Sequence, residues 1–147
     1  MGAAVVEDDL LTYAGRLADA AETQARSAKI AVCISVVDLH GNPVLFRRMS
    51  GSKLIAIEMA VLKARTAVAL DMSTADLFDL VQPGQPLFTL TASNGGRYVA
   101  FGGGVPIHAH GRLLVGLGIS GGTVDEDTAL ADAAIKRAFL IDGDGKK

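Results

Sequence analysis

The sequence predicts a single α+β domain, built on a largely antiparallel five-stranded sheet with flanking helices. The chain has 147 residues, of which 50% are hydrophobic, and a domain of this size buries about 70% of its unfolded surface. Segments with helical and strand-like apolar patterns alternate along the chain. Short links join consecutive strands, which makes these strands antiparallel neighbours. We expect one domain over residues 1–147, with an ordered core of about 8–140.

The first half of the chain predicts a helix, a hairpin and a second helix. Apolar residues recur at helical spacing from Leu10 to Ala28, which indicates an amphipathic helix. The β-branched run Ile30 to Val37 is typical of a strand covered on both faces. The turn Asp38 to Pro43 then returns the chain into a second strand, Val44 to Arg48. A helix with apolar residues around most of its circumference fits Ser52 to Leu70.

The second half predicts three more strands between two helices that begin with capping boxes. Ser73 to Asp76 has the capping pattern and opens a short helix that ends near Leu80. Thr123 to Glu126 has the full T-x-x-E pattern and opens a last helix to about Leu140. The three strands are Leu87–Thr91, Arg97–Phe101 and Leu113–Ile119.

Composition excludes several classes of function. The net charge is −2 and the basic residues are scattered, whereas nucleic-acid-binding proteins present a basic stripe to phosphates. No apolar run approaches the ~20 residues of a membrane span, and no basic targeting segment precedes the first helix. We therefore expect a cytoplasmic protein. The single cysteine, Cys33, excludes an internal disulfide and a zinc site built from cysteines.

A glycine-rich stretch from Ser93 to Gly122 is expected to shape a small-molecule pocket. Its segment Gly116 to Gly121 matches the G-x-G-x-x-G pattern, but these glycines lie inside a strand and only one helix follows, which excludes a dinucleotide site. Gly116 and Gly118 share one face of the strand, where they open a flat groove or let a helix pack closely. Ser120 to Thr123 either binds an anion at the following helix or caps that helix.

Three histidines and one lysine are candidates for chemistry. His108 and His110 are two residues apart and would share a face of a strand, although a metal site needs a third ligand; solvated histidines are the alternative. His40 lies in the first hairpin turn. Each of the three could serve as an axial haem ligand. Lys63 lies in a stripe of small residues, where it could act as a base with a depressed pKa, or pair with a carboxylate at a subunit contact.

Four segments resemble the GlcG/HbpS-type haem-binding family, which includes the C-terminal domain of PduO-type corrinoid adenosyltransferases and stand-alone relatives. They are VVDLHGNPVLFRRMSG, KARTAVAL, QPGQPLFTLTASNGGRYVAFGGGVPI and GLGISGGT. The similarity covers roughly Asp8 to Leu140. It implies a profilin-like domain that forms homo-oligomers and binds haem or another tetrapyrrole. The adenosyltransferase activity belongs to a domain that this chain lacks, so it does not carry over.

The resemblance also implies a ligand pocket. Its lining would be Arg47, Arg48, Met49, Lys63, Asn94, Gly95, Gly103, Gly104 and Pro106. The basic side chains would meet propionates or another carboxylate, and the glycines would form an open wall. We therefore expect a protein that binds haem or a related tetrapyrrole. The alternative is an enzyme that uses Lys63 on a small carboxylated or carbonyl metabolite in the same pocket.

Overall fold

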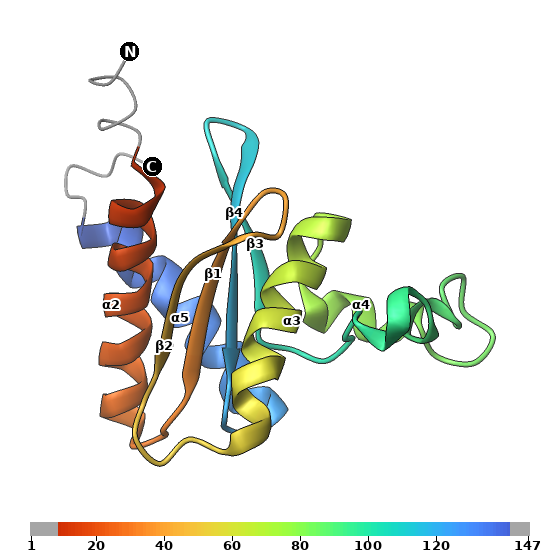
Figure 1. The fold of residues 1–147 in the computed structure, drawn as a ribbon, viewed down its shortest axis with the longest axis horizontal. Coiled ribbons are helices and arrows are strands. Elements are labelled where there is room, and N and C mark those ends of the chain that lie inside the picture. Colours follow the sequence, from red (N-terminus) through yellow and green to blue (C-terminus); the bar gives the residue numbers. More distant parts are fainter. Residues whose placement is uncertain (1–8, 142–147) are drawn as a thin grey trace.

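The computed structural model describes residues 9–141, and within them one antiparallel sheet has four strands (Figure 1). The strands are β1 (Cys33–Asp38), β2 (Pro43–Arg48), β3 (Gly104–Ala109) and β4 (Arg112–Ser120). Their order across the sheet is β2-β1-β4-β3. The α+β class and the antiparallel pairing are confirmed. The expected count of five strands is wrong for the described part of the chain.

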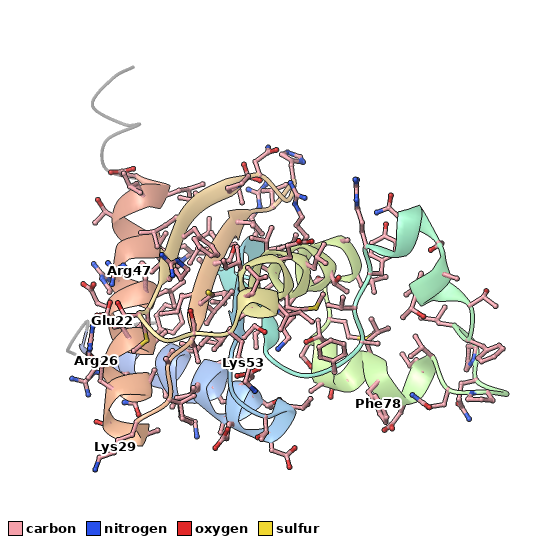
Figure 2. All side chains as sticks on the ribbon, turned by 60° about the horizontal axis from the view of Figure 1, so that its bottom comes forward. Glu22, Arg26, Lys29, Arg47, Lys53 and Phe78 are labelled. Atoms are coloured by element: carbon pink, nitrogen blue, oxygen red, sulfur yellow. The ribbon has the colours of Figure 1, made fainter. Side chains whose placement is uncertain are left out.

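Helices cover both faces of the sheet. They are α2 (Leu10–Ala28), α3 (Leu54–Leu70), α4 (Thr74–Leu80) and α5 (Val124–Ile141). Helices α2 and α5 pack together on one face, whereas α3 lies on the other face with α4 beside it (Figure 1). The edge strand β2 is tied to α2, because Nη1 of Arg47 lies 3.1 Å from Oε1 of Glu22 (Figure 2).

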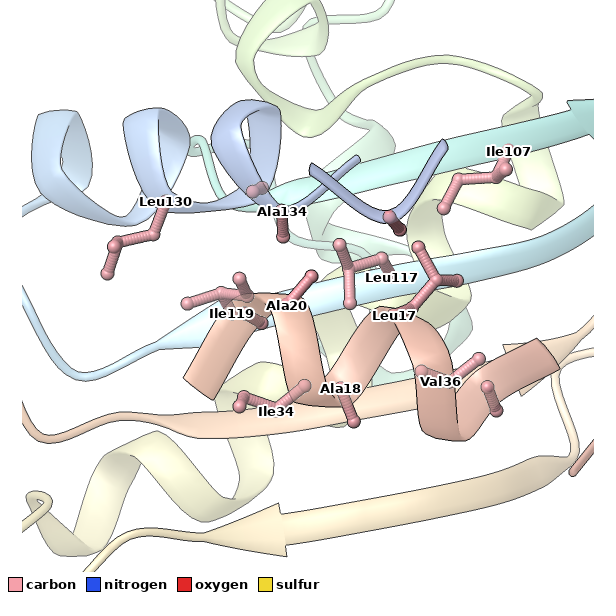
Figure 3. Packing of buried hydrophobic residues seen from close by; sticks show 14 of the residues in the cluster. Leu17, Ala18, Ala20, Ile34, Val36, Ile107, Leu117, Ile119, Leu130 and Ala134 are labelled. Atoms are coloured by element: carbon pink, nitrogen blue, oxygen red, sulfur yellow. The ribbon is translucent and has the colours of Figure 1, made fainter. Parts of the chain in front are cut away.

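The main core lies between the sheet and the α2–α5 layer (Figure 3). Alternate residues of the central strands point into it, including Ile34 and Val36 of β1 and Leu117 and Ile119 of β4. The helices contribute mainly alanines, such as Ala18 of α2. Small helical residues let the two helices approach the sheet and each other closely, which suits a chain with few aromatic residues.

Both predicted capping positions are confirmed. Ser73 Oγ accepts a hydrogen bond of 3.1 Å from the Asp76 N–H, at the start of α4. At the start of α5, the Thr123 N–H donates to Glu126 Oε1 at 2.8 Å, and the Glu126 N–H donates to Thr123 Oγ1 at 3.1 Å. These reciprocal bonds satisfy N–H groups that a helix would otherwise leave without partners.

Residues 81–101, which we call the arm, form no strand, so the predictions of strands at Leu87–Thr91 and Arg97–Phe101 are wrong. The arm projects beside α4 (Figure 1) and holds two single 3₁₀ turns, Leu90–Ala92 and Asn94–Gly96. Gly95 and Gly96 have φ of 68° and 76°, outside the extended region that a ladder requires. The Val99 N–H donates to Thr66 Oγ1 of α3 at 3.1 Å instead of pairing with a strand.

Strand β3 lies between Phe101 and Leu113, where the sequence predicts no strand. It begins at Gly104 and contains Pro106, which has no N–H to donate to a ladder. Proline is tolerated here because β3 is an edge strand and pairs only with β4. His110 and Gly111 join β3 to β4 in a tight turn, with φ of 54° and 75°. Two positive φ values are typical of a type I′ turn.

Candidate functional site

Lys63 is buried on the α3 side of the sheet. Its side chain is 1% exposed, and its Nζ donates to Asp127 Oδ2 at 3.0 Å and to the Ile119 carbonyl at 2.9 Å. The other oxygen of Asp127 accepts from the Gly122 N–H at 2.8 Å. One ammonium and one carboxylate therefore connect α3, β4 and α5. The acidic partner lies in the same chain, so this contact is not the subunit contact that the sequence suggested.

The electrostatics of Lys63 follow from this enclosure. Burial lowers the pKa of Lys63 below 10.5, while the adjacent Asp127 carboxylate opposes that shift. The Nζ also lies 5.3 Å from the centroid of the Phe101 ring, at the end of the arm. A lysine in this position holds three elements and the arm together. A catalytic role for it stays a prediction.

The glycines of β3 and β4 pack against the backbone of α3. A Cβ added to Gly104 would lie 2.8 Å from the carbonyl carbon of Lys63, and one added to Gly118 would lie 2.8 Å from the backbone nitrogen of Ala64. Real Cβ atoms do not come this close to other atoms. Only glycine at these positions therefore lets α3 pack directly on β3 and β4. Of the two alternatives for this face of β4, the structure shows close packing of a helix, because α3 occupies the position of the flat groove. The small-residue stripe around Ala60 is buried in the same contact.

The structure does not bring the predicted lining residues into one pocket. Arg47 lies on the α2 face of the sheet, where its Nη1 is 2.8 Å from Oδ1 of Asp19, whereas Lys63 lies on the α3 face. Gly103 and Gly104 lie against Lys63. The remaining residues are dispersed: Arg48 on β2, Met49 against the main core, Asn94 and Gly95 on the arm, and Pro106 on β3.

The three histidines lie in different settings. His108 Nε2 is 2.8 Å from Oδ1 of Asp71, at the end of α3, whereas His110 lies in the β3–β4 turn and His40 in the β1–β2 turn. Among residues 9–141, no three His, Cys, Asp or Glu side chains are grouped to hold a metal ion. The histidines therefore do not form a shared metal site in the described structure, and each is left as a single candidate ligand.

Two hollows flank the β1–β2 turn, and Leu39 lines both. The larger, which we call the hairpin-tip hollow, measures about 670 Å³ and lies between the start of α2 and the β3–β4 hairpin; His110 and Arg112 line it. The smaller, which we call the basic hollow, measures about 360 Å³ and lies between the β1–β2 turn, α3 and the arm. Both fall within or near the usual range of ligand sites, about 300–1,000 Å³. Neither is lined by Lys63.

Asp38 holds the turn between the two hollows. Its Oδ1 accepts from the N–H groups of His40 and Asn42, both at 2.9 Å, and its Oδ2 accepts from Nδ2 of Asn42 at 3.3 Å. Partial burial raises the pKa of Asp38, but the bonds from Asn42 and His40 outweigh it, so the pKa lies below 3.8. The carboxylate thus fixes the position of His40 through its backbone.

Asp38→Ala is expected to lower the free energy of unfolding by about 2 kcal/mol, because it removes a charged acceptor of three hydrogen bonds. Since folding lowers the pKa of Asp38, its stabilisation is complete above pH 3.8 and is lost as the pH falls through the folded-state pKa. Urea unfolding of both proteins should therefore show a difference near neutral pH that shrinks below pH 3.8. A difference that does not change with pH would contradict this role of the carboxylate.

The fold is a small α+β domain with a helical layer on each face of an antiparallel sheet. A family model described as "Haem degrading protein HbpS-like" matches residues 11–136. The chain belongs to this HbpS-like family, which confirms the predicted resemblance. Among the described residues, none of the helices is long and apolar enough to cross a membrane.

Two curated relatives show different lengths of match. An uncharacterized 15.0 kDa protein of Citrobacter freundii, from the dhaT–dhaS intergenic region, is 38% identical over 125 residues, which cover 85% of this chain and 88% of that protein. The corrinoid adenosyltransferase PduO of Salmonella typhimurium is 42% identical over 120 residues, which cover 82% of this chain but only 36% of PduO. This chain is therefore similar to one part of PduO.

Solved structures share the fold. The Klebsiella pneumoniae protein ORFY has a TM-score of 0.84 and 36% identity, covering 87% of this chain and 88% of that one. The PduOC:haem complex has a TM-score of 0.81 and 41% identity, covering 83% and 88%. The crystal structure of HbpS has a TM-score of 0.78 and 29% identity, covering 86% and 87%.

Proposed function

We propose that this protein binds haem or a related tetrapyrrole in the hairpin-tip hollow, with His110 as the axial ligand. The observation that carries the proposal is the position of His110 in a hollow of about 670 Å³ whose lining combines leucine side chains with two arginines. Haem needs an apolar slot for its ring and a side chain that donates an electron pair to iron, and histidine commonly fills the second role. The related structure of a PduOC:haem complex supports this choice of ligand.

The lining of the hairpin-tip hollow fits the two ends of such a ligand. Leu10, Leu113 and Leu114 supply apolar surface for a ring system. Arg16 and Arg112 lie in the same lining, and guanidinium groups bind the carboxylates of propionates in a bidentate manner. The tight turn restricts the backbone of His110, which limits the positions that its imidazole can take.

Titration of the purified apoprotein with haemin tests this function. We expect a shifted Soret band that saturates near one haem per subunit, and a loss of this shift in His110→Ala. The matched controls are His40→Ala and His108→Ala, which remove histidines outside the hairpin-tip hollow and should retain the wild-type spectrum. Saturable binding that survives in His110→Ala would place the haem elsewhere. A featureless titration of the wild type would remove the haem function itself.

The family description also favours a second function, the degradation of haem. The loaded protein from the same titration distinguishes the two. When ascorbate is added in air, a binding protein keeps its Soret band, whereas a degrading protein loses the band faster than free haemin does. No described contact favours the alternative in which Lys63 acts on a metabolite, because its Nζ is enclosed and bonded to Asp127.

Assembly into homo-oligomers belongs to the same proposal. Exposed apolar side chains at the helix starts support it: Leu54 and Ile55 of α3 are 83% and 63% exposed, and Val124 of α5 is 47% exposed. Both helices begin at the same end of the sheet (Figure 1). Apolar surface of this kind is typical of contacts between subunits. Light scattering of the purified protein measures the assembly.

A further inference from the structure

The basic hollow lies outside the proposed tetrapyrrole site, and three separate segments form it. The β1–β2 turn contributes His40, the second half of α3 contributes Arg65, and the arm contributes Arg97 and Tyr98. Figure 1 shows this turn next to the C-terminal end of α3. The segments lie far apart in the sequence, so the hollow exists only in the folded protein.

Positive charge dominates the lining of the basic hollow. Among residues 9–141, the lining contains two arginines and one histidine but no carboxylate, although the chain as a whole carries a net charge of −2. Within residues 9–141, neither Arg65 nor Arg97 forms an ion pair. The oxygens of the nearby Asp38 are occupied by hydrogen bonds inside the turn. The two guanidinium groups thus have no anionic partner in the described part of the chain.

One of these arginines is held in place. Arg65 Nε donates to the Gly41 carbonyl at 2.9 Å, which anchors the side chain across the turn. That bond uses one of five guanidinium N–H groups, and the four on the terminal nitrogens have no partner within residues 9–141. A guanidinium fixed in this way loses little conformational entropy when it binds an anion.

The rest of the lining indicates the class of anion. Asn94 and Tyr98 offer neutral hydrogen-bonding groups, whereas Leu39, Val68 and Ala69 offer apolar surface for a short carbon chain. Such a mixture suits an organic acid better than an inorganic ion, which has no apolar part. The volume of about 360 Å³ suits a molecule of a few carbons and is about half that of the hairpin-tip hollow.

We propose that the basic hollow binds a small organic carboxylate, with Arg65 and Arg97 as the residues that hold its carboxylate groups. Arginine forms paired, parallel hydrogen bonds to a carboxylate, which give both affinity and orientation. The site is separate from the tetrapyrrole site, so the chain would carry two different ligands on the two sides of Leu39.

Isothermal titration of the haem-free protein with succinate tests the proposal. We expect saturable binding near one succinate per subunit, weakened at least about tenfold in Arg65→Gln and in Arg97→Gln, since each loses a charged hydrogen-bond donor. Arg97→Lys should bind succinate more weakly than the wild type but more tightly than Arg97→Gln, because lysine keeps the positive charge but cannot form the paired hydrogen bonds of a guanidinium. Arg112→Gln and His110→Ala lie in the other hollow and should bind succinate as the wild type does.

Three results would overturn the proposal. They are the absence of succinate binding to the wild type, wild-type binding in both Arg65→Gln and Arg97→Gln, and binding of inorganic phosphate or neutral succinamide at least as tight as that of succinate. Arg97 has no ion pair within residues 9–141, so Arg97→Gln keeps the test valid if Arg65→Gln fails to fold. Because His110→Ala is included, a failure of the haem function and a failure of the carboxylate site give different results.

Discussion

Lys63→Met is expected to lower the free energy of unfolding by about 3–5 kcal/mol, the usual effect of removing one partner of a buried ion pair. The substitution leaves the carboxylate of Asp127 buried, with a side chain 3% exposed and, within residues 9–141, only the Gly122 N–H as its remaining partner. It also leaves the Ile119 carbonyl without the Lys63 ammonium. Urea unfolding followed by circular dichroism measures the loss.

A double-mutant cycle separates the pair from simple packing. Asp127→Asn keeps an acceptor for the Gly122 N–H but removes the charge. We expect Lys63→Met combined with Asp127→Asn to be less destabilised than the sum of the single variants, because no unpaired charge remains. Additive effects would contradict an energetic coupling between the two groups.

An exposed ion pair in the same chain provides the matched control. Nη2 of Arg26 lies 2.8 Å from Oε2 of Glu22, on side chains that are 66% and 29% exposed. The N–O distance of this pair is shorter than that between Lys63 and Asp127. Arg26→Met is nevertheless expected to lower the free energy of unfolding by less than about 1 kcal/mol, because solvent screens exposed charges. A large loss here would show that distance, rather than burial, determines the effect.

The sequence predicts best those elements whose signals are local. The capping residues Ser73 and Thr123 mark the starts of α4 and α5 because a helix start needs a nearby side-chain acceptor. The run around Ile34 predicts β1 because the strand is covered on both faces. Each signal needs only residues that are neighbours in the chain.

The arm shows where local signals fail. Leu87–Thr91 and Arg97–Phe101 contain residues that favour strands, but a strand also needs a partner. The strand β3 occupies the hydrogen-bonding edge of β4. Its glycines and Pro106 are residues typical of loops, so the sequence does not predict this strand. The Val99 N–H therefore donates to the hydroxyl of Thr66 in α3. Strand propensity alone cannot predict this contact.

The sequence predicts the candidate site less well than the fold, because the site depends on which face of the sheet each side chain occupies and on which helix covers that face. Arg47 pairs across the ladder with Ile34, whose side chain points toward α2, so the alternation along β1 was a usable signal that Arg47 lies away from Lys63. The basic hollow offered no such signal. Arg65 and Arg97 come together only because the arm returns past α3, and no local pattern encodes that return.

Gly118→Ala is expected to lower the free energy of unfolding by about 3 kcal/mol or more, or to prevent folding. Its Cβ would lie 2.8 Å from the backbone nitrogen of Ala64 and would clash with the carbonyl of Ala60 as well. Both obstacles are backbone atoms of α3, so no rotamer change relieves them, and the helix must move away from the sheet. That movement would open the contacts of Lys63, which lies on the same helix.

Gly15→Ala is the matched control, because the same methyl group is added where it meets nothing. Gly15 lies inside α2, and no atom would be within 4 Å of its new Cβ. Alanine favours a helix over glycine, so this variant should gain roughly 0.5–1 kcal/mol of stability. Thermal unfolding of both variants should therefore move in opposite directions. If Gly118→Ala kept the stability of the wild type, α3 would not rest on β4 through this glycine.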